Sequence, residues 1–279
     1  MREPAWVRRV GASTFRGWGM ATAGLRPPPE FLLIGTKRGG TTSLGRYLFD
    51  HPAVTPLFPA RATPKGVRYL DEHADRSARW YRSHFATVLT RGPAMRPRKL
   101  AGEATANYLF HPGAAARAVA VAPDAKIVVL VRDPVDRAWS HWRERSRRGV
   151  ETLRFEEALE AEAERLAAAG PEGANLAYRG QGRYAALLEP WFERFERDRV
   201  LVLVSEEFFA DPAAVYERTL AFLGLRPHDL QAYPAYNYRE PVERMLDVTR
   251  RELETAFVAE NRRLEALLGR ELPWHHRRG

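Results

Sequence analysis

The chain has 279 residues, of which 45% are hydrophobic and 28% charged, as expected for a folded protein with a substantial core. It contains no cysteine, which excludes disulfides, thiolate metal sites and thiol nucleophiles. The net charge of +9 is spread among acids, as in EALEAEAERL, so we expect a mixed solvated surface and no nucleic-acid partner. No run approaches the roughly 18 apolar residues of a membrane span, and the N-terminal segment lacks the apolar stretch of a secretory signal. We therefore expect no transmembrane segment and a cytoplasmic location.

The first half of the chain predicts a strand, a helix and a long loop before the next helix. The stretch 1–29 ends in three prolines and is expected to be an irregular lead-in, while 30–275 should form a single α/β domain. An apolar run that ends in glycine is typical of a buried strand. The elements predicted here are a strand at Phe31–Gly35, a helix at Thr41–Phe49, a proline-rich loop at 51–68 and a helix at Ser77–Leu89.

The second half alternates apolar runs with helical patterns. The predicted strands are Leu100–Glu103, Lys126–Val131 and Val200–Val204. The predicted helices are 113–122, 134–148, Phe155–Ala169, Tyr184–Phe195, a helix that opens at Asp211-Pro212, and 247–268, with loops at 170–182 and 226–246. Strands that alternate with helices indicate a parallel sheet covered on both faces. The fold class expected is therefore α/β, a P-loop-like three-layer α/β/α arrangement with a central parallel sheet.

The segment IGTKRGGTTSL joins the first predicted strand to the first helix. A helix N-terminus after a glycine turn gathers backbone N–H groups and partial positive charge, which suits a bound anion. Glycine lets the backbone approach a phosphate closely, and the neighbouring cations and hydroxyls add donors. The residues expected to hold the anion are Lys37, Arg38, Gly39, Gly40, Thr41, Thr42 and Ser43.

This segment departs from the triphosphate-binding pattern GxxxxGK[ST]. Gly35 and Gly40 have the spacing of that pattern, but Thr41 occupies the position of its lysine. No acid that could hold magnesium follows an apolar strand in a clear way, since Asp133 lies between an arginine and a proline. We therefore expect an anion site that needs no metal. A P-loop kinase is the alternative, and it would show magnesium-dependent ATP binding.

Two motifs together resemble the sulfotransferases that use 3′-phosphoadenosine 5′-phosphosulfate (PAPS). IGTKRGGTTSL is similar to the loop that holds the 5′-phosphosulfate in that family. In VLVRDPVDRAWSHW, Arg132 and Ser140 match the arginine and serine that hold the 3′-phosphate. The resemblance implies PAPS as sulfuryl donor, adenosine 3′,5′-bisphosphate as product, no metal, and a small-molecule or glycan acceptor. It spans roughly residues 30–275 and is nearest to the bacterial and heparan-sulfate-type branch.

Other matches to the family are short. In related enzymes the region around GRY and the loop before the last helix lie near the nucleotide. Tyr184 and Arg239 are therefore expected to bind the cofactor, with Gly182, Arg183 and Tyr238 as further candidates.

The chain differs from the family at positions that bear on catalysis. Arg38 stands where the family has a lysine beside the transferred sulfate, with Lys37 one residue earlier. Gly66 stands where many members have a glutamate base, and Ala104 replaces a second lysine. We therefore expect Lys37, Arg38 and Glu103 to be catalytic, with Glu103 as the base. Asp71, Glu72 and His73 are alternative bases, and a non-catalytic cofactor-binding relative is the alternative function.

Overall fold

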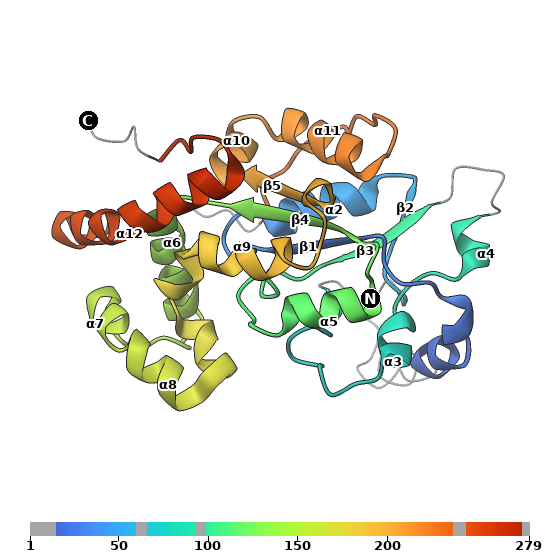
Figure 1. Cartoon of the computed structure of the whole chain (residues 1–279), viewed down its shortest axis with the longest axis horizontal. Helices are drawn as coiled ribbons and strands as arrows, with labels where there is room; N and C mark the ends of the chain where they lie inside the picture. Colours follow the sequence, from blue (N-terminus) through green and yellow to red (C-terminus); the bar gives the residue numbers. More distant parts are fainter. Residues whose placement is uncertain (1–14, 60–65, 93–98, 237–243, 275–279) are drawn as a thin grey trace, which may run out of the picture.

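The computed structural model describes residues 15–59, 66–92, 99–236 and 244–274. Within these ranges, strands pair in parallel to form one sheet of five, in the order β2-β3-β1-β4-β5 (Figure 1). Their bounds are Phe31–Gly35 for β1, Val54–Thr55 for β2, Leu100–Ala104 for β3, Lys126–Val131 for β4 and Val200–Val204 for β5. The predictions for β1, β4 and β5 are confirmed residue for residue. The short edge strand β2 was missed, and lies within the predicted loop.

Helices cover both faces of this sheet, so the three-layer α/β/α prediction is confirmed (Figure 1). The α-helices are α2 (Thr41–Asp50), α3 (Ala78–Arg82), α4 (Val88–Arg91), α5 (Ala114–Val121), α6 (Pro134–Arg147), α7 (Phe155–Glu160), α8 (Glu162–Gly173), α9 (Tyr184–Phe192), α10 (Ser205–Ala210), α11 (Pro212–Leu223) and α12 (Asp247–Leu268). Short 3₁₀ helices are η1 (Ala23–Leu25), η2 (Ala174–Leu176), η3 (Gly180–Gly182) and η4 (Arg197–Arg199).

Alternate residues of β1 face the two helical layers. Leu32 and Ile34 belong to a buried cluster with residues of α5, α9 and α12. Phe31 and Leu33 belong to a second cluster, with residues of α2, α10 and α11. A strand buried on both faces needs apolar side chains at every position, which explains the continuous run FLLIG.

Two predicted helices are each divided in the structure. The helix expected at Ser77–Leu89 becomes α3 and α4, because the Ser83 hydroxyl donates to the carbonyl of Trp80 at 2.6 Å and Thr87 caps the start of α4. The helix expected at Phe155–Ala169 is interrupted at Ala161, between α7 and α8. The apolar spacing along the sequence continues across both breaks. A side-chain hydrogen bond to the backbone can end a helix without altering that spacing, so the sequence pattern did not show the breaks.

The lead-in and two loops also hold more helix than the sequence indicates. Residues 15–21 are helical and η1 follows, so this part of the expected irregular segment is ordered, while residues 1–14 lie outside the described ranges. The loop expected at 170–182 contains the end of α8, then η2 and η3. Helix α10, directly after β5, was not predicted because SEEFFA is too short to show a helical period.

The close packing of β3 against β1 gives a stability prediction. Gly102 pairs with Phe31, and a Cβ added at Gly102 would lie 2.4 Å from the Phe31 ring. Since Phe31 is buried, we expect Gly102→Ala to lower the free energy of unfolding by about 1–3 kcal/mol, as measured by chemical denaturation. The matched control is Gly17→Ala, where an added Cβ meets nothing within 4 Å and stability should be unchanged or slightly higher. A Gly102→Ala variant as stable as the parent would contradict this packing argument.

Candidate active site

The loop from β1 to α2 lies at the carboxyl edge of the sheet, where ligands of open parallel sheets bind. Its backbone is tied to the two neighbouring strand ends. The amide of Thr36 donates to the carbonyl of Leu130 in β4 at 2.8 Å, and the Ser205 hydroxyl after β5 donates to the carbonyl of Gly39 at 2.8 Å. The loop is therefore fixed by contacts that are remote in sequence.

The two glycines of this loop are required by geometry. A Cβ on Gly39 would lie 3.0 Å from the carbonyl oxygen of Leu130. Gly40 has a φ of 97° and precedes the first turn of α2, a conformation that favours glycine. No side-chain hydrogen bond caps this helix start, so its amides and its positive dipole face outward from the sheet edge. This is a cradle suited to a phosphate group.

The structure brings together the arginine pair and the serine that the two sequence motifs contain. The Nε of Arg38 donates to the Oγ of Ser140 at 3.0 Å, although these residues are 102 positions apart. The Nη1 of Arg132 donates to the carbonyl of Arg38 at 3.0 Å. Arg38 itself has a φ of 68°, so its backbone adopts the left-handed conformation uncommon for a side-chain-bearing residue. The loop and the helix α6 motif thus form one site.

Tyr184 contacts the backbone of Arg132. The residue is buried, and its hydroxyl donates to the carbonyl of Arg132 at 2.8 Å. That contact holds the backbone of Arg132, so Tyr184 has a structural contact at this site. Arg239, the other predicted contact of this group, lies outside the described residues.

The three hydroxyls at the start of α2 lie in different environments. Thr41 and Ser43 are buried, whereas Thr42 is exposed. The Oγ of Ser43 accepts a hydrogen bond from the backbone N–H of Tyr236 at 3.0 Å. Ser43 therefore anchors the segment before α12 to the first turn of α2, a contact that the sequence did not indicate.

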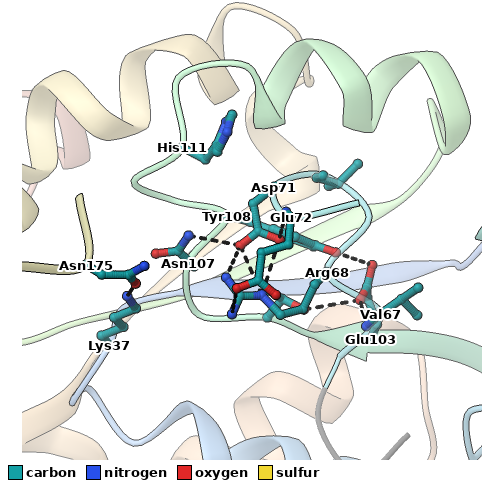
Figure 2. Close-up of polar contacts among 12 residues, drawn as sticks. Lys37, Val67, Arg68, Asp71, Glu72, Glu103, Asn107, Tyr108, His111 and Asn175 are labelled. Atoms are coloured by element: carbon teal, nitrogen blue, oxygen red, sulfur yellow. Dashed lines mark hydrogen bonds and ion pairs between the residues drawn. The ribbon is translucent and has the colours of Figure 1, made fainter. Parts of the chain in front are cut away.

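Lys37 is held by a residue of η2. Its Nζ donates to Oδ1 of Asn175 in η2 at 2.7 Å, as Figure 2 shows, and Arg145 donates to the same oxygen at 3.4 Å. Burial, together with the charges of Arg145 and Arg68, lowers the pKa of the Lys37 ammonium to about 7, while the charge of Asp71 acts in the opposite direction. The Lys37 side chain is therefore a buried amine that changes its charge near pH 7.

A stripe of basic residues on α6 was missed by sequence reasoning. Arg137 is buried, and its Nη2 donates to the carbonyl of Tyr178, while its Nε and Nη1 have no partner among the described residues. His141, one turn later, is also buried, and desolvation together with the charges of Arg137 and Lys37 lowers the pKa of its imidazole well below the usual value. With Arg145 these residues follow a spacing of four, which was the available sequence signal.

A second polar group contains Arg68, Asp71, Glu72 and Asn107 (Figure 2). Arg68 donates to both carboxylate oxygens of Asp71, with its Nε 3.2 Å from Oδ2, and forms an ion pair with Glu72 at 2.6 Å. Asn107 donates to Oδ2 of Asp71 at 2.9 Å. Asp71 is buried and Glu72 exposed, so this group offers one fixed and one accessible carboxylate.

Glu103 is not part of that open group. It is fully buried, and its Oε1 accepts from the hydroxyls of Tyr81 and Tyr108 at 2.7 and 3.0 Å. Its Oε2 accepts from the backbone N–H of Val67 at 2.6 Å and from the Thr105 hydroxyl at 3.2 Å. Burial raises the pKa of the Glu103 carboxyl, although these hydrogen bonds oppose the shift. The geometry joins β3 to the segment that carries Arg68, and gives no support to the expected role as base.

Gly66 has no room for a side chain. A Cβ there would lie 1.9 Å from Oγ1 of Thr105 and 2.6 Å from the carbonyl oxygen of Ala104. The Gly66 amide donates to that same carbonyl at 3.1 Å, which holds the two backbones close. The glutamate that the family resemblance implies at this position is therefore incompatible with the local backbone.

The residue considered for magnesium has a structural role. Asp133 caps α6, and its Oδ1 accepts from the amides of Val135 and Asp136 at 2.8 and 3.1 Å. Burial raises the pKa of the Asp133 carboxyl to about 6. Within the described residues, no group of three or more histidine, aspartate or glutamate side chains is arranged to hold a metal ion.

Comparison with known proteins places this geometry in a family. A family model described as "Sulfotransferase family" matches residues 29–229. The mouse heparan sulfate glucosamine 3-O-sulfotransferase 3B1 is 31% identical over 73% of this chain and 48% of its own length. The mouse bifunctional heparan sulfate N-deacetylase/N-sulfotransferase 4 is 29% identical over 76% of this chain. This chain spans 23% of that enzyme's length, so it corresponds to one part of the larger relative.

A solved structure agrees with these matches. A sulfotransferase from Alicyclobacillus acidocaldarius superposes with a TM-score of 0.69 and 30% sequence identity, covering 89% of this chain and 99% of its own. In the part of the chain that the structure describes, no helix is both long and apolar enough to cross a bilayer. The family model, the relatives and the phosphate cradle beside Arg132 lead to one conclusion: this chain belongs to the sulfotransferase family.

Proposed function

We propose that this chain transfers a sulfuryl group from PAPS to a hydroxyl or amine of a carbohydrate, lipid or small metabolite. The observation that carries the proposal is the junction of Arg38, Arg132 and Ser140 beside the glycine loop. This junction offers two adjacent anion sites, one at the start of α2 and one at the end of β4. A nucleotide with a 5′-phosphate and a 3′-phosphate on one ribose requires two such sites close together. The chain's membership of the sulfotransferase family supports the same proposed function.

The residues present fit this nucleotide. Arg38 and the amides at the start of α2 would hold the 5′-phosphosulfate, with Lys37 on the acceptor side of the same group. Arg132, whose planar guanidinium can grip a phosphate with two parallel N–H groups, would hold the 3′-phosphate together with Ser140. This second site would discriminate against nucleotides that lack a 3′-phosphate, including ATP.

The chemical step is a transfer in which the chain supplies position and charge. PAPS supplies the sulfuryl group: the acceptor forms a bond to sulfur as the bond from sulfur to the 5′-phosphate oxygen breaks, and the phosphate keeps the electron pair. Arg38 and Lys37 stabilise the negative charge that develops on that oxygen. The acceptor's proton must pass to a base. We propose that Glu72 or Asp71, rather than Glu103, receives it, because Glu72 is exposed and Asp71 shares its partner Arg68 in the polar group of Figure 2, whereas Glu103 is fully buried.

A non-catalytic relative that only binds the nucleotide is the second candidate. The absence of room for a glutamate at Gly66 is the observation that favours it. Incubation with labelled PAPS and a panel of glycan, lipid and aromatic hydroxyl and amine acceptors separates the two. Transfer to any acceptor supports the enzyme, whereas nucleotide binding without any transfer supports the relative.

Removal of the Arg132 guanidinium tests the 3′-phosphate site. We expect Arg132→Ala to weaken binding of adenosine 3′,5′-bisphosphate at least tenfold, about 1.4 kcal/mol, in isothermal titration calorimetry. Binding of adenosine 5′-phosphate should change much less, because it lacks the phosphate that Arg132 holds. Arg194→Ala, which removes an exposed arginine of an ion pair with Glu193, is the control and should bind like the parent. Equal losses for both nucleotides would remove Arg132 from the 3′-phosphate site.

A carboxylate series tests the position of the base. Glu103→Gln keeps an oxygen for the Val67 amide, so it should retain kcat within a few fold, while Glu103→Ala should lower the free energy of unfolding by roughly 2–3 kcal/mol. Either Glu72→Gln or Asp71→Asn should lower kcat by 100-fold or more, the loss typical of a missing general base. If Glu103→Gln alone abolished transfer while remaining folded, Glu103 would be the base after all.

The lowered pKa of Lys37 predicts proton uptake on nucleotide binding. At pH 8 the amine is largely neutral, because its pKa is about 7, and a bound polyanion favours the ammonium form. Calorimetry of adenosine 3′,5′-bisphosphate binding in buffers of different ionisation enthalpy should therefore show uptake at pH 8 that is much smaller at pH 6. Lys37→Met should remove most of the uptake at pH 8. Identical uptake in parent and variant would show that Lys37 does not titrate with binding.

A further inference from the structure

Exposed apolar side chains gather where the N-terminal helical segment meets α3 and α4. Within the described residues, nine large hydrophobic side chains are exposed, and five of them come from only two stretches of the sequence. Trp18 is 61% exposed and Leu89 is 83% exposed, and the other three are Phe15, Leu25 and Val88. Exposed apolar patches of this kind mark surfaces that bind proteins or membranes.

The first of these stretches is hydrogen-bonded to α3. Nη1 of Arg16 donates to the hydroxyl of Ser83, the residue that follows α3, at 3.1 Å. Nε of Arg79, within α3, donates to the carbonyl of Met20 at 3.1 Å. Figure 1 shows the helical segment 15–21 beside α3. The segment that carries Trp18 is therefore fixed on the body of the protein.

Helix α4 is joined to the same part of the chain. Nη2 of Arg91, the last residue of α4, donates to the carbonyl of Pro27 at 2.8 Å, although the two residues are 64 positions apart. Leu89 lies two positions before Arg91, and Leu25 lies two positions before Pro27. The five exposed side chains thus lie on two stretches that the fold brings together, and we call this surface the N-terminal face.

The charge of the N-terminal face has one sign. The described stretches 15–28 and 77–92 contain five arginines and no aspartate or glutamate. If the chain's 35 acids were spread evenly over 279 residues, about four would fall in stretches of this length. Arg26 and Arg91 are buried, whereas Arg79 is exposed and Arg16 and Arg82 are partly exposed. The evenly mixed surface expected from the sequence is therefore not found here.

The neighbouring sequence has the same excess of arginine. Residues 1–14 and 93–98 adjoin these stretches in the chain, and both lie outside the described residues. Their charged residues are Arg2, Arg8, Arg9, Arg96 and Arg98, against the single acid Glu3. Clustered cations next to an apolar surface are the composition that anionic lipids attract.

We propose that the N-terminal face docks on the surface of an anionic lipid bilayer. Apolar and aromatic side chains enter the boundary between headgroups and acyl chains, while arginines at the same surface bind the lipid phosphates. The contact is with the surface alone, because no helix in the described part of the chain is long and apolar enough to cross a bilayer.

The chemistry of this face disfavours other occupants. A second copy of the chain, docked by a two-fold axis, would place these arginines against the same arginines. A nucleic acid or a sulfated glycan would pair with the arginines but would leave Leu25, Val88 and Leu89 in water. The proposal uses none of the residues assigned to the nucleotide, so it does not depend on the proposed function.

Co-sedimentation of the full chain with lipid vesicles tests the proposal. We expect binding to vesicles that contain phosphatidylglycerol and phosphatidylcholine, weakening as salt is added, and at least tenfold weaker binding to phosphatidylcholine alone. The double variant Arg79→Gln, Arg82→Gln should bind the anionic vesicles about twentyfold more weakly, since each surface cation contributes roughly fivefold. The double variant Trp18→Ser, Leu89→Ser should lose at least tenfold.

Two control variants are matched in chemistry but lie elsewhere. Val150→Ser with Val248→Ser removes two exposed apolar side chains, and Arg194→Gln with Arg263→Gln removes two exposed arginines. Both should bind the anionic vesicles like the parent. Thermal unfolding of each variant, followed by circular dichroism, shows that a loss of binding is not a loss of fold.

Three results would overturn the proposal. The first is a parent that binds neither kind of vesicle, including one that binds only soluble heparin. The second is folded variants of the N-terminal face that bind anionic vesicles as tightly as the control variants. The third is a parent dimer in sedimentation velocity that Trp18→Ser, Leu89→Ser converts to monomer, because a second copy would then cover this face.

Discussion

The parallel pairing of β1 with β4 is the constraint on which the site depends. Leu33 pairs with Val128 and Gly35 with Val129, so both strands run toward the same edge of the sheet. The chain leaves β1 as a glycine loop and leaves β4 at Arg132, and the guanidinium of Arg132 reaches the backbone of that loop. If the strands were antiparallel, the two motifs would lie at opposite edges, roughly a strand length apart. The meeting of the glycine loop with Arg132, on which the proposed nucleotide site rests, is therefore a consequence of sheet topology.

The same edge concentrates positive charge, and the fold holds it there. Glu162 accepts from the backbone amides of Tyr178, Arg179 and Gly180 at 2.7–2.8 Å, which helps to fix the segment from Asn175 to Gly180. That segment provides the acceptor oxygen for Lys37 and the carbonyl for Arg137. Desolvation by burial, and then repulsion from nearby arginines, lowers the pKa of Lys37, so keeping this ammonium charged costs free energy. A bound polyanion would relieve this repulsion and, by binding only the folded state, would stabilise the protein.

The parts of this molecule that the sequence reveals are those governed by local rules. Strand runs such as KIVVLV are continuous and apolar because both faces are buried, and the loop with Gly39 and Gly40 has a recognisable spacing. The contact between Arg38 and Ser140 was not predicted, since 102 residues separate them and the family resemblance paired Ser140 with Arg132. Glu103 illustrates what such local rules omit. Its place at the end of a strand led us to expect a catalytic base, but its burial and its hydrogen bonds to Tyr81 and Tyr108 depend on tertiary packing, which the sequence does not show.

The chain departs from the family pattern at Gly66 and Ala104, which we propose border the acceptor, and at Arg38 in the glycine loop. Gly66 is forced by close backbone contact with Ala104, and Arg68, Asp71 and Asn107 fill the region with a different polar network. Two questions therefore remain separate: which nucleotide the chain binds, and which group accepts the sulfuryl group. Identifying the bound nucleotide is the more direct test of the proposed function.

A crystal structure with adenosine 3′,5′-bisphosphate provides that test. The account predicts the 5′-phosphate against the glycine loop at the start of α2, and the 3′-phosphate within hydrogen-bonding distance of Arg132 and Ser140. Electron density for the nucleotide at any other place, with these two strand ends vacant, would contradict it.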